Sequence, residues 1–215
     1  HGGSLYASGW DNADGRNQLW SFSVDDLAPS DLCGLTGTLN DLIVDSADTI
    51  YFSGGVWGKL TPAGGNACAI ETIPNETFIQ QIVLHEEALY GASLQGPLWM
   101  AADMTGAFCV TSWTGMDFSA YGLGVGETGL AYVATDNYNT NDIPSIYIFQ
   151  GQDLVSPAAP IAGQFPGISH TQDVAVWERF AYVTADDTED TVTAINIATP
   201  EAPWQVGQLE GAGGP

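Results

Sequence analysis

The chain has 215 residues, of which 45% are hydrophobic and 11% aromatic, and this apolar content excludes a generally disordered chain. Its charge is one-sided: 26 Asp and Glu face only Arg16, Lys59 and Arg179, for a formal net charge of −23. Because binding to phosphates requires clustered Lys and Arg, nucleic acid is excluded as a partner, and an anionic membrane surface is excluded for the same reason. No apolar run approaches the roughly 20 residues of a membrane span. Cationic partners, metal ions or a salty medium are favoured.

An apolar residue followed by Tyr recurs along the whole chain. The five Tyr residues are Tyr6, Tyr51, Tyr90, Tyr132 and Tyr182. Their spacings of 45, 39, 42 and 50 residues match the length of one four-stranded propeller blade, about 40–50 residues in the familiar repeats.

Other features keep the same phase as these Tyr residues. Four of the Tyr follow a predicted innermost strand, at 41–44, 81–84, 123–125 and 173–176. A third strand follows each Tyr, with one shared position occupied by Trp20, Trp57, Trp99, Tyr147 and Thr193. A short fourth strand is predicted to end at Leu35, Ile70, Val110, Ala162 and Val206. The position just before it is occupied by Cys33, Cys68, Cys109, Pro160 and Pro203.

These repeats predict an all-β fold: a β-propeller of about five four-stranded antiparallel blades, in one domain spanning residues 1–215. The predicted repeats are 1–37, 38–74, 75–115, 116–167 and 168–211. The first repeat lacks an innermost strand, because only four residues precede Leu5. We therefore expect nineteen strands, with either a three-stranded first blade or a larger propeller that continues beyond the given ends.

The last two repeats resemble a known family. Residues 173–176, 181–184, 193–197 and 200–207 are similar to the LVIVD repeat, as are residues 131–134 through 156–160. The similarity is good over 116–211, moderate over 38–115 and poor before that, and the LVIVD core itself reads Thr193-Ala194-Ile195-Asn196-Ile197. The resemblance implies a secreted or surface β-propeller of a bacterium or archaeon, and it brings no catalytic residues.

Three loops between the second and third strands of their repeats are rich in Asp and Asn. They belong to repeats one, four and five, which are neighbours if the ring closes. We expect the loops to crowd one end of the propeller with His170 nearby, and clustered carboxylates suit a hard cation such as Ca²⁺. The candidate ligands are Asp11, Asp14, Asp136, Asp142, Asp186, Asp187 and His170. The alternative interpretation is ordinary turn chemistry, in which Asp and Asn are common.

A copper site is a second metal hypothesis, because imidazole suits copper and an N-terminal His can chelate it. The alternative ligands are His1, His85 and His170. The repeats place His85 between strands one and two of the third unit and His170 in the connection before the fifth, on the opposite face. The two are not expected to meet.

Enzyme motifs are absent: the sequence has no Gly-x-Ser-x-Gly elbow, no P-loop and no His-Glu-x-x-His. The best enzyme hypothesis is glycoside hydrolysis by carboxylates at blade starts, Asp41, Asp117 and Asp173. Asp173 belongs to the repeat signature, which favours a structural role. Trp10, Trp113 and Trp204 are candidates for stacking on sugar or for packing between blades.

The sequence therefore predicts a non-catalytic binding or scaffold propeller with an acidic face, secreted or at the cell surface. Its partner would be a protein or a glycan. The chain starts at His1 and the sequon Asn75-Glu76-Thr77 occurs once, so we expect a mature form lacking its signal peptide. The alternatives are a metal-binding surface protein and a glycoside hydrolase.

Overall fold

The computed structural model describes residues 4–11, 16–25, 27, 29–35, 38–47, 49–55, 57–64, 67–73, 78–86, 88–93, 98–102, 108–109, 119–136, 144–150, 161–186 and 190–211. These residues form strands and turns and no helix, so the predicted all-β class is confirmed. It follows that the described ranges hold no helix of the length and apolarity that crossing a membrane requires.

Five antiparallel sheets succeed one another along the chain. The first sheet has three strands: β1 (Ser4–Asp11), β2 (Arg16–Ser23) and β3 (Pro29–Leu35). The second has β4 (Leu39–Val44), β5 (Ile50–Gly54), β6 (Trp57–Gly64) and β7 (Ala67–Ile73). The third has β8 (Ile79–His85), β9 (Ala88–Ser93), β10 (Leu98–Ala102) and β11 (Phe108–Cys109).

The last two sheets repeat the same plan, in which each strand pairs with the next along the chain. The fourth has β12 (Ser119–Val125), β13 (Leu130–Asp136), β14 (Ile146–Gln150) and β15 (Ile161–Phe165). The fifth has β16 (Thr171–Trp177), β17 (Phe180–Ala185), β18 (Thr191–Asn196) and β19 (Trp204–Glu210).

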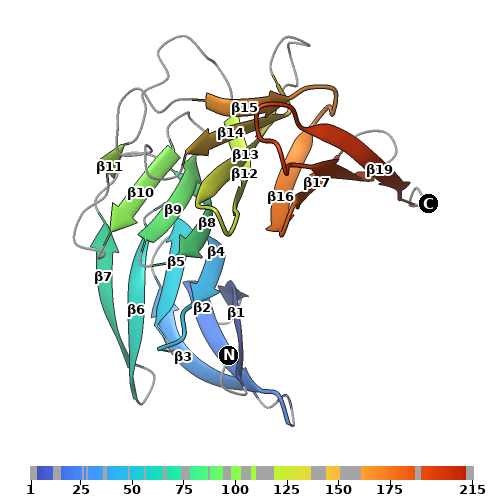
Figure 1. Cartoon of the computed structure of the whole chain (residues 1–215). Coiled ribbons are helices and arrows are strands. Elements are labelled where there is room, and N and C mark those ends of the chain that lie inside the picture. The colour runs from blue at the N-terminus through green and yellow to red at the C-terminus, as the bar shows by residue number, and fades with distance from the viewer. Residues whose placement is uncertain are drawn as a thin grey trace.

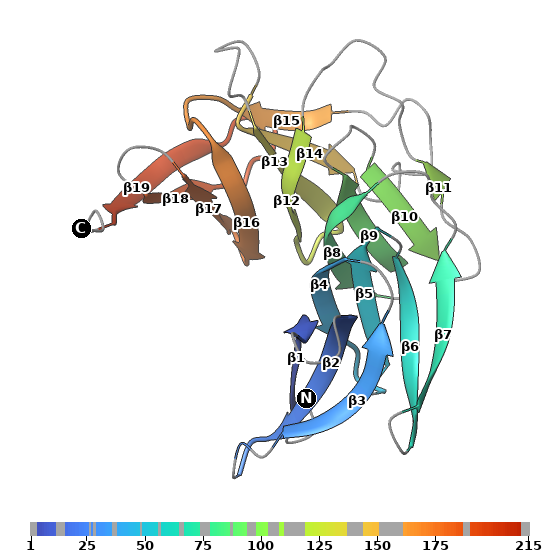
Figure 2. The ribbon, with the colours of Figure 1, turned by 180° about the vertical axis from the view of Figure 1, so that it is seen from behind.

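The sheets stand side by side around an open arc, with the first sheet at one end and the fifth at the other (Figure 1). Seen from behind, the strands β4, β8, β12 and β16 line the concave side, and β7, β11, β15 and β19 lie on the convex side (Figure 2). In each four-stranded sheet the chain therefore proceeds strand by strand from the concave side to the convex side.

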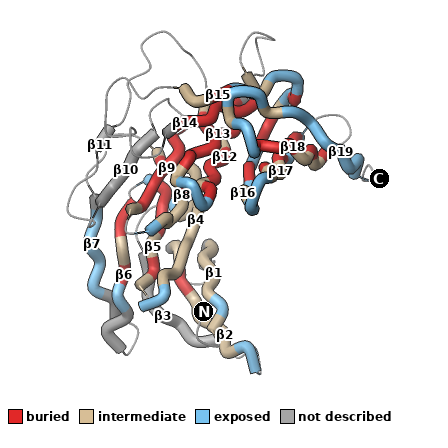
Figure 3. The backbone as a smooth tube through the Cα atoms, in the orientation of Figure 1, coloured by how far each residue is buried: buried red, intermediate tan, exposed pale blue. Residues whose placement is uncertain are grey.

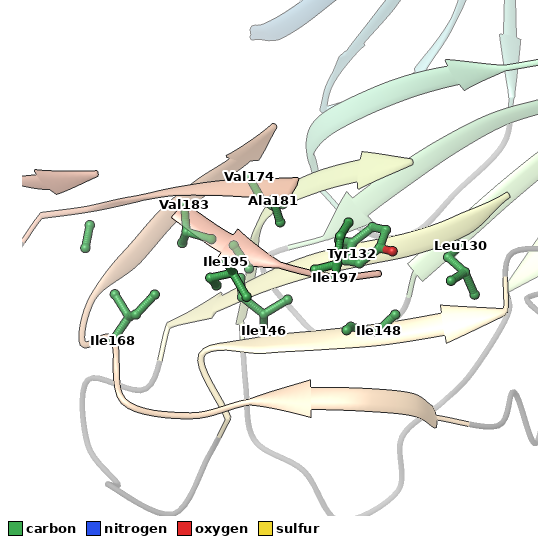
Figure 4. Close-up of a cluster of buried hydrophobic side chains, with 12 residues drawn as sticks. Leu130, Tyr132, Ile146, Ile148, Ile168, Val174, Ala181, Val183, Ile195 and Ile197 are labelled. Carbon is green, nitrogen blue, oxygen red and sulfur yellow. The ribbon is translucent and has the colours of Figure 1, made fainter. Parts of the chain in front are cut away.

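The second, third and fourth sheets are covered on both faces by their neighbours. β13 shows this: Tyr132 points to one side and Val133 to the other, and both are buried. The face that carries Tyr132 also carries Leu130 and Ile148, and it packs on Val183 and other residues of the fifth sheet (Figure 4). We call the equivalent side of every sheet its Tyr face.

The same interface recurs at each junction of the arc. Tyr90 packs with Leu123 and Val133 of the fourth sheet. The partners of Tyr51 include Ile82 of the third sheet. Residues of the first two sheets, Tyr6 among them, form another such cluster. The Tyr face of each of the first four sheets therefore packs against the opposite face of the next sheet.

The sequence-derived repeat agrees with these elements. Tyr51, Tyr90, Tyr132 and Tyr182 all lie on the second strand of their sheet, as predicted. Tyr6 lies on β1, which leads a three-stranded sheet. The described residues contain nineteen strands, and each sheet falls within one predicted repeat.

Three details of the predicted register are wrong. Trp57 does not share the position of Trp20 and Trp99, because Gly58 pairs with the residue after Tyr51 and Trp57 lies one residue earlier. Trp57 is thereby turned onto the Tyr face, where it packs against the third sheet. The fourth strands β7, β15 and β19 continue past their predicted ends because the third strand offers a longer ladder. The three Cys residues lie within the last strand of their sheets, β3, β7 and β11, rather than before it.

A prediction about the thiols follows from this placement. Cys33, Cys68 and Cys109 lie in β3, β7 and β11, which belong to three different sheets. Disulfides require Cα atoms within about 7 Å, so we expect no disulfide among the three. Titration of the denatured, unreduced protein should find three free thiols, and a single free thiol would contradict this arrangement.

Candidate functional site

A β-bulge recurs at one position of the innermost strands. In β4, β8, β12 and β16 the pairing with the second strand skips one residue near the start of the strand. The skipped residues are Asn40, Gln80, Tyr121 and Gln172. The residues directly after the bulges are Asp41, Gln81, Gly122 and Asp173, and we call this set the inner-strand belt. Bulges re-aim side chains, and here they direct polar groups toward the neighbouring sheets.

The belt side chains bind the backbone of the following sheet. Oδ1 of Asp41 accepts a hydrogen bond from the backbone N–H of Leu42 at 2.9 Å, and Oδ2 accepts one from the N–H of Ile82 in β8 at 3.0 Å. Oε1 of Gln81 accepts a hydrogen bond from the N–H of Leu123 in β12. Each acceptor thus ties its own sheet to the residue after the belt position of the next sheet.

The belt passes over Gly122, which has no side chain to contribute. Nε2 of Gln81 reaches beyond the fourth sheet and donates to Oδ1 of Asp173 in β16 at 2.8 Å. The same Oδ1 accepts a hydrogen bond from the N–H of Val174 at 2.7 Å. Side chains on the second, third and fifth sheets therefore connect the second sheet to the fifth.

The belt bears on the glycosidase hypothesis. Burial raises the pKa of Asp41, the N–H groups of Ile82 and Leu42 oppose that rise, and the charge of Asp173 adds to it. Asp41 and Asp173 are both engaged by donors that hold the sheets together. Asp117 lies outside the described residues.

The acidic-loop residues are distributed over both ends of the arc. Asp11 ends β1 in the first sheet, whereas Asp136 ends β13 and Asp186 follows β17 in the last two sheets. The structure brings the last two sheets together and places the first at the opposite end of the arc (Figure 1). Asp14, Asp142 and Asp187 lie outside the described residues.

His170 lies beside Asp186 through the backbone: the N–H of Asp186 donates to the carbonyl of His170 at 3.0 Å. The connection that carries His170 is anchored on the fourth sheet by Ile168, whose N–H donates to Oγ of Ser145 at 2.8 Å. Oγ1 of Thr171 donates to the carbonyl of Thr135. These three hydroxyl and backbone contacts fix the connection, and sequence patterns gave no signal for them because serine and threonine are common everywhere.

The histidines do not meet within the described residues. His85 is the last residue of β8, and His170 directly precedes β16. The innermost strands run in the same direction, so the two His lie at opposite ends of them, and His1 lies outside the described residues. Among the residues that the structure describes, no three His, Cys, Asp or Glu side chains gather in a way that would hold a metal ion. The calcium and copper sites stay predictions.

A salt comparison tests the calcium prediction. Crowded carboxylates repel one another, and a bound divalent cation or plain screening relieves that repulsion. We expect millimolar CaCl₂ to raise the melting temperature more than NaCl of matched ionic strength. Equal shifts measured by differential scanning calorimetry would leave screening as the whole effect.

A separate acidic site lies in the β4–β5 turn. Oδ1 of Asp45 accepts hydrogen bonds from the N–H groups of Ala47 and Thr49 at 2.8 and 2.9 Å, and Oδ2 accepts one from the Tyr51 hydroxyl at 3.1 Å. Burial acts to raise the pKa of Asp45, but the hydrogen bonds from Thr49, Ala47 and Tyr51 outweigh it and lower the pKa. The carboxylate therefore closes the turn in its ionised form.

This lowered pKa predicts a pH dependence. The stabilisation by Asp45 is complete above its unfolded pKa of about 3.9 and is lost as the pH falls through the lower folded value. Asp45→Ala should cost about 1 to 2 kcal/mol at pH 7, and the cost should shrink toward pH 3. Urea unfolding at several pH values measures it, with the exposed Asp25→Ala as control. A cost that does not change with pH would contradict the assignment.

A pocket of about 360 Å³ opens between the fourth and fifth sheets. Its lining includes Tyr132, Glu178 and Arg179. The guanidinium of Arg179 lies 5.2 Å from the centre of the Phe180 ring, and burial raises the pKa of Tyr132 to about 12. The pocket therefore offers a cation and a phenol that stays protonated at physiological pH.

Comparisons with known proteins show the fold. No family model matches the sequence, and no curated protein matches it. The WD40 β-propeller domain of Doa1 is similar in structure, with a TM-score of 0.71 and 15% identity over 97% of this chain and 65% of that one. A chain from the nidogen/laminin complex matches with a TM-score of 0.67 and 10% identity, over 97% of this chain and 76% of that one.

A protein of unknown function from Bacteroides thetaiotaomicron is also similar, with a TM-score of 0.57 and 13% identity over 84% of this chain and 53% of that one. The chain spans less than two thirds of the length of the Doa1 domain. These likenesses, together with the four-stranded sheets around an arc, establish that the chain has a β-propeller fold.

Proposed function

We propose that the chain is a non-catalytic β-propeller module, of about five blades, that binds a protein partner in the secreted or cell-surface compartment. The inner-strand belt carries this proposal. Carboxylates on the concave side are where a propeller hydrolase would place its acid and base. Here Asp41 and Asp173 are instead engaged by hydrogen bonds that join the sheets.

A structural neighbour and the sequence resemblance both favour a protein partner at the surface. One structural neighbour was solved in the nidogen/laminin complex, which joins two proteins. The LVIVD resemblance of residues 116–211 is to secreted and surface propellers. The partner we expect carries a basic surface, because a net charge of −23 accelerates association with cations and repels acidic proteins.

A capture experiment tests the proposal. The chain is immobilised and exposed to the secreted and cell-surface protein fraction of its source, and the retained protein is then purified and titrated. We expect a basic binder whose association rate falls about tenfold or more between 50 and 500 mM NaCl. The test variant carries Asp186→Asn and Asp190→Asn, which remove two exposed carboxylates of the fifth sheet. It should associate more slowly than the wild type.

Two results would overturn the proposal. The first is an association rate that changes neither with salt nor in the variant with Asp186→Asn and Asp190→Asn. That result would mean that the acidic residues take no part in recognition. The second is turnover of a chromogenic glycoside that is abolished by Asp41→Asn or Asp173→Asn in variants that remain folded at the assay temperature, which would make the chain a hydrolase.

A further inference from the structure

The Tyr face of the fifth sheet is apolar and uncovered. Cross-strand pairing places Trp177 opposite Phe180, and Asn196 between Phe180 and Trp204, so these aromatic residues share one face. Tyr182, Ala194, Val192 and Leu209 continue it. The exposed fractions are 65% for Trp177, 49% for Trp204 and 69% for Leu209. Figure 3 shows β19 exposed along its length.

This face is the same surface that forms every other junction of the arc. In the first four sheets the Tyr face is covered by the next sheet. The opposite face of the fifth sheet, with Val174, Val183 and Ile195, is already packed on the fourth. The Tyr face of the fifth sheet, which we call the Tyr182 face, is therefore equivalent to the faces that form the other junctions, and no sheet covers it.

The inner-strand belt gives a second, independent observation. In Asp41, Oδ1 binds the N–H of its own strand and Oδ2 binds the N–H of the next sheet. In Asp173, Oδ1 accepts from Val174 and from Gln81. Within the described residues Oδ2 of Asp173 receives no hydrogen bond. Since Oδ1 binds the N–H of the next residue in both Asp41 and Asp173, Oδ2 of Asp173 is the counterpart of the oxygen with which Asp41 binds the following sheet.

We infer that a further propeller blade packs on the Tyr182 face. The innermost strand of that blade lies beside β16 and donates a backbone N–H to Oδ2 of Asp173. The facing side of that blade would carry small and β-branched residues, as Val174, Ala181 and Val183 do on the fifth sheet. The aromatic residues of the Tyr182 face would pack between these side chains.

The arc argues against a second copy of this chain as the occupant. The five sheets align with 65% of the Doa1 propeller domain and 76% of the nidogen/laminin chain. The unaligned remainder of either chain is smaller than the aligned part, so a ring of this curvature has room for fewer than five more blades. This inference is independent of which partner the propeller binds.

Hydroxyl-radical footprinting tests the inference on two samples: the isolated 215-residue chain and the native protein or assembly purified from its source. Trp177, Trp204 and Leu209 should be oxidised rapidly in the isolated chain and at least tenfold more slowly in the native sample. Ile70 and Leu27, exposed hydrophobic residues away from this face, are the controls and should react equally in both.

A photo-crosslinker at Leu209 identifies what covers the face in the native sample. Crosslinks to strand segments of a repeat 40–50 residues long would support the inference. Equal oxidation in the two samples would overturn it, and so would crosslinks to a helical partner or to the first sheet of another copy. Protection that rises with the concentration of the isolated chain would also overturn it in favour of a second copy.

Discussion

Asp41→Ala is expected to lower the free energy of unfolding by about 3 kcal/mol, because hydrogen bonds to a charged acceptor contribute about 1.5–3 kcal/mol each. The substitution removes both carboxylate oxygens and leaves the N–H groups of Leu42 and Ile82 without their acceptor. For a chain of this size the melting temperature should fall by roughly 10 °C. Urea unfolding followed by tryptophan fluorescence measures the effect.

Asp41→Asn is the matched variant, since it keeps the shape and one acceptor oxygen, and it should lose about half as much. The pKa of Asp41 is raised in the folded state, so its contribution to stability falls as the pH rises from about 3.9 through the folded value. The advantage of the wild type over Asp41→Asn should therefore narrow over that pH range. If Asp41→Ala proved no more costly than Asp25→Ala, an exposed carboxylate, the belt would not hold the sheets together.

The repeat was predictable from sequence because its signal is periodic. The apolar-Tyr pairs mark second strands that are buried on both faces, as Tyr132 and Val133 are, and such strands tolerate few residue types. Trp57 was misplaced because only composition marked the third strand there. Gly58 occupies the position that Trp20 and Trp99 hold in their sheets. A larger residue does not fit there, because a Cβ at Gly58 would lie 2.1 Å from the carbonyl oxygen of Glu71.

The belt was not predictable in the same way. Asp41 and Ile82 are 41 residues apart, and no local pattern reports a hydrogen bond of that range. The bulges before Asp41 and Gln81 shift the strand register by one residue. Alternation of apolar and polar residues along the sequence does not reveal such a shift. The exposure of the Tyr182 face was equally invisible, because covered and uncovered faces of a blade carry the same apolar pattern.

The candidate metal site shows the same limit. Sequence placed Asp136 and Asp186 after equivalent strands, and the structure has them in neighbouring sheets. Grouping them with Asp11 depended on closing the ring between the first and fifth sheets. The arc is open there (Figure 1), and the length of a ring depends on blade-to-blade curvature, which no single repeat encodes.

Gly122→Ala is expected to destabilise the fold by about 3 kcal/mol, the upper part of the range for overpacking. A Cβ at Gly122 would lie 2.5 Å from Cα of Asp173 and 2.8 Å from its carbonyl carbon and from the nitrogen of Val174. These are backbone atoms, so no flexible side chain can move aside, and β12 and β16 must separate. The separation would also break the hydrogen bond from Gln81 to Asp173.

The sign of the effect decides the interpretation. An unconstrained glycine within a strand destabilises it by about 0.5–1 kcal/mol relative to alanine, so Gly122→Ala would stabilise the protein if the two strands were not in close contact. Gly207→Ala in β19 is the control, because a Cβ there meets nothing within 4 Å, and it should be neutral or slightly stabilising. Equal stabilisation by both substitutions in urea unfolding would mean that the innermost strands of the fourth and fifth sheets stand further apart than the belt requires.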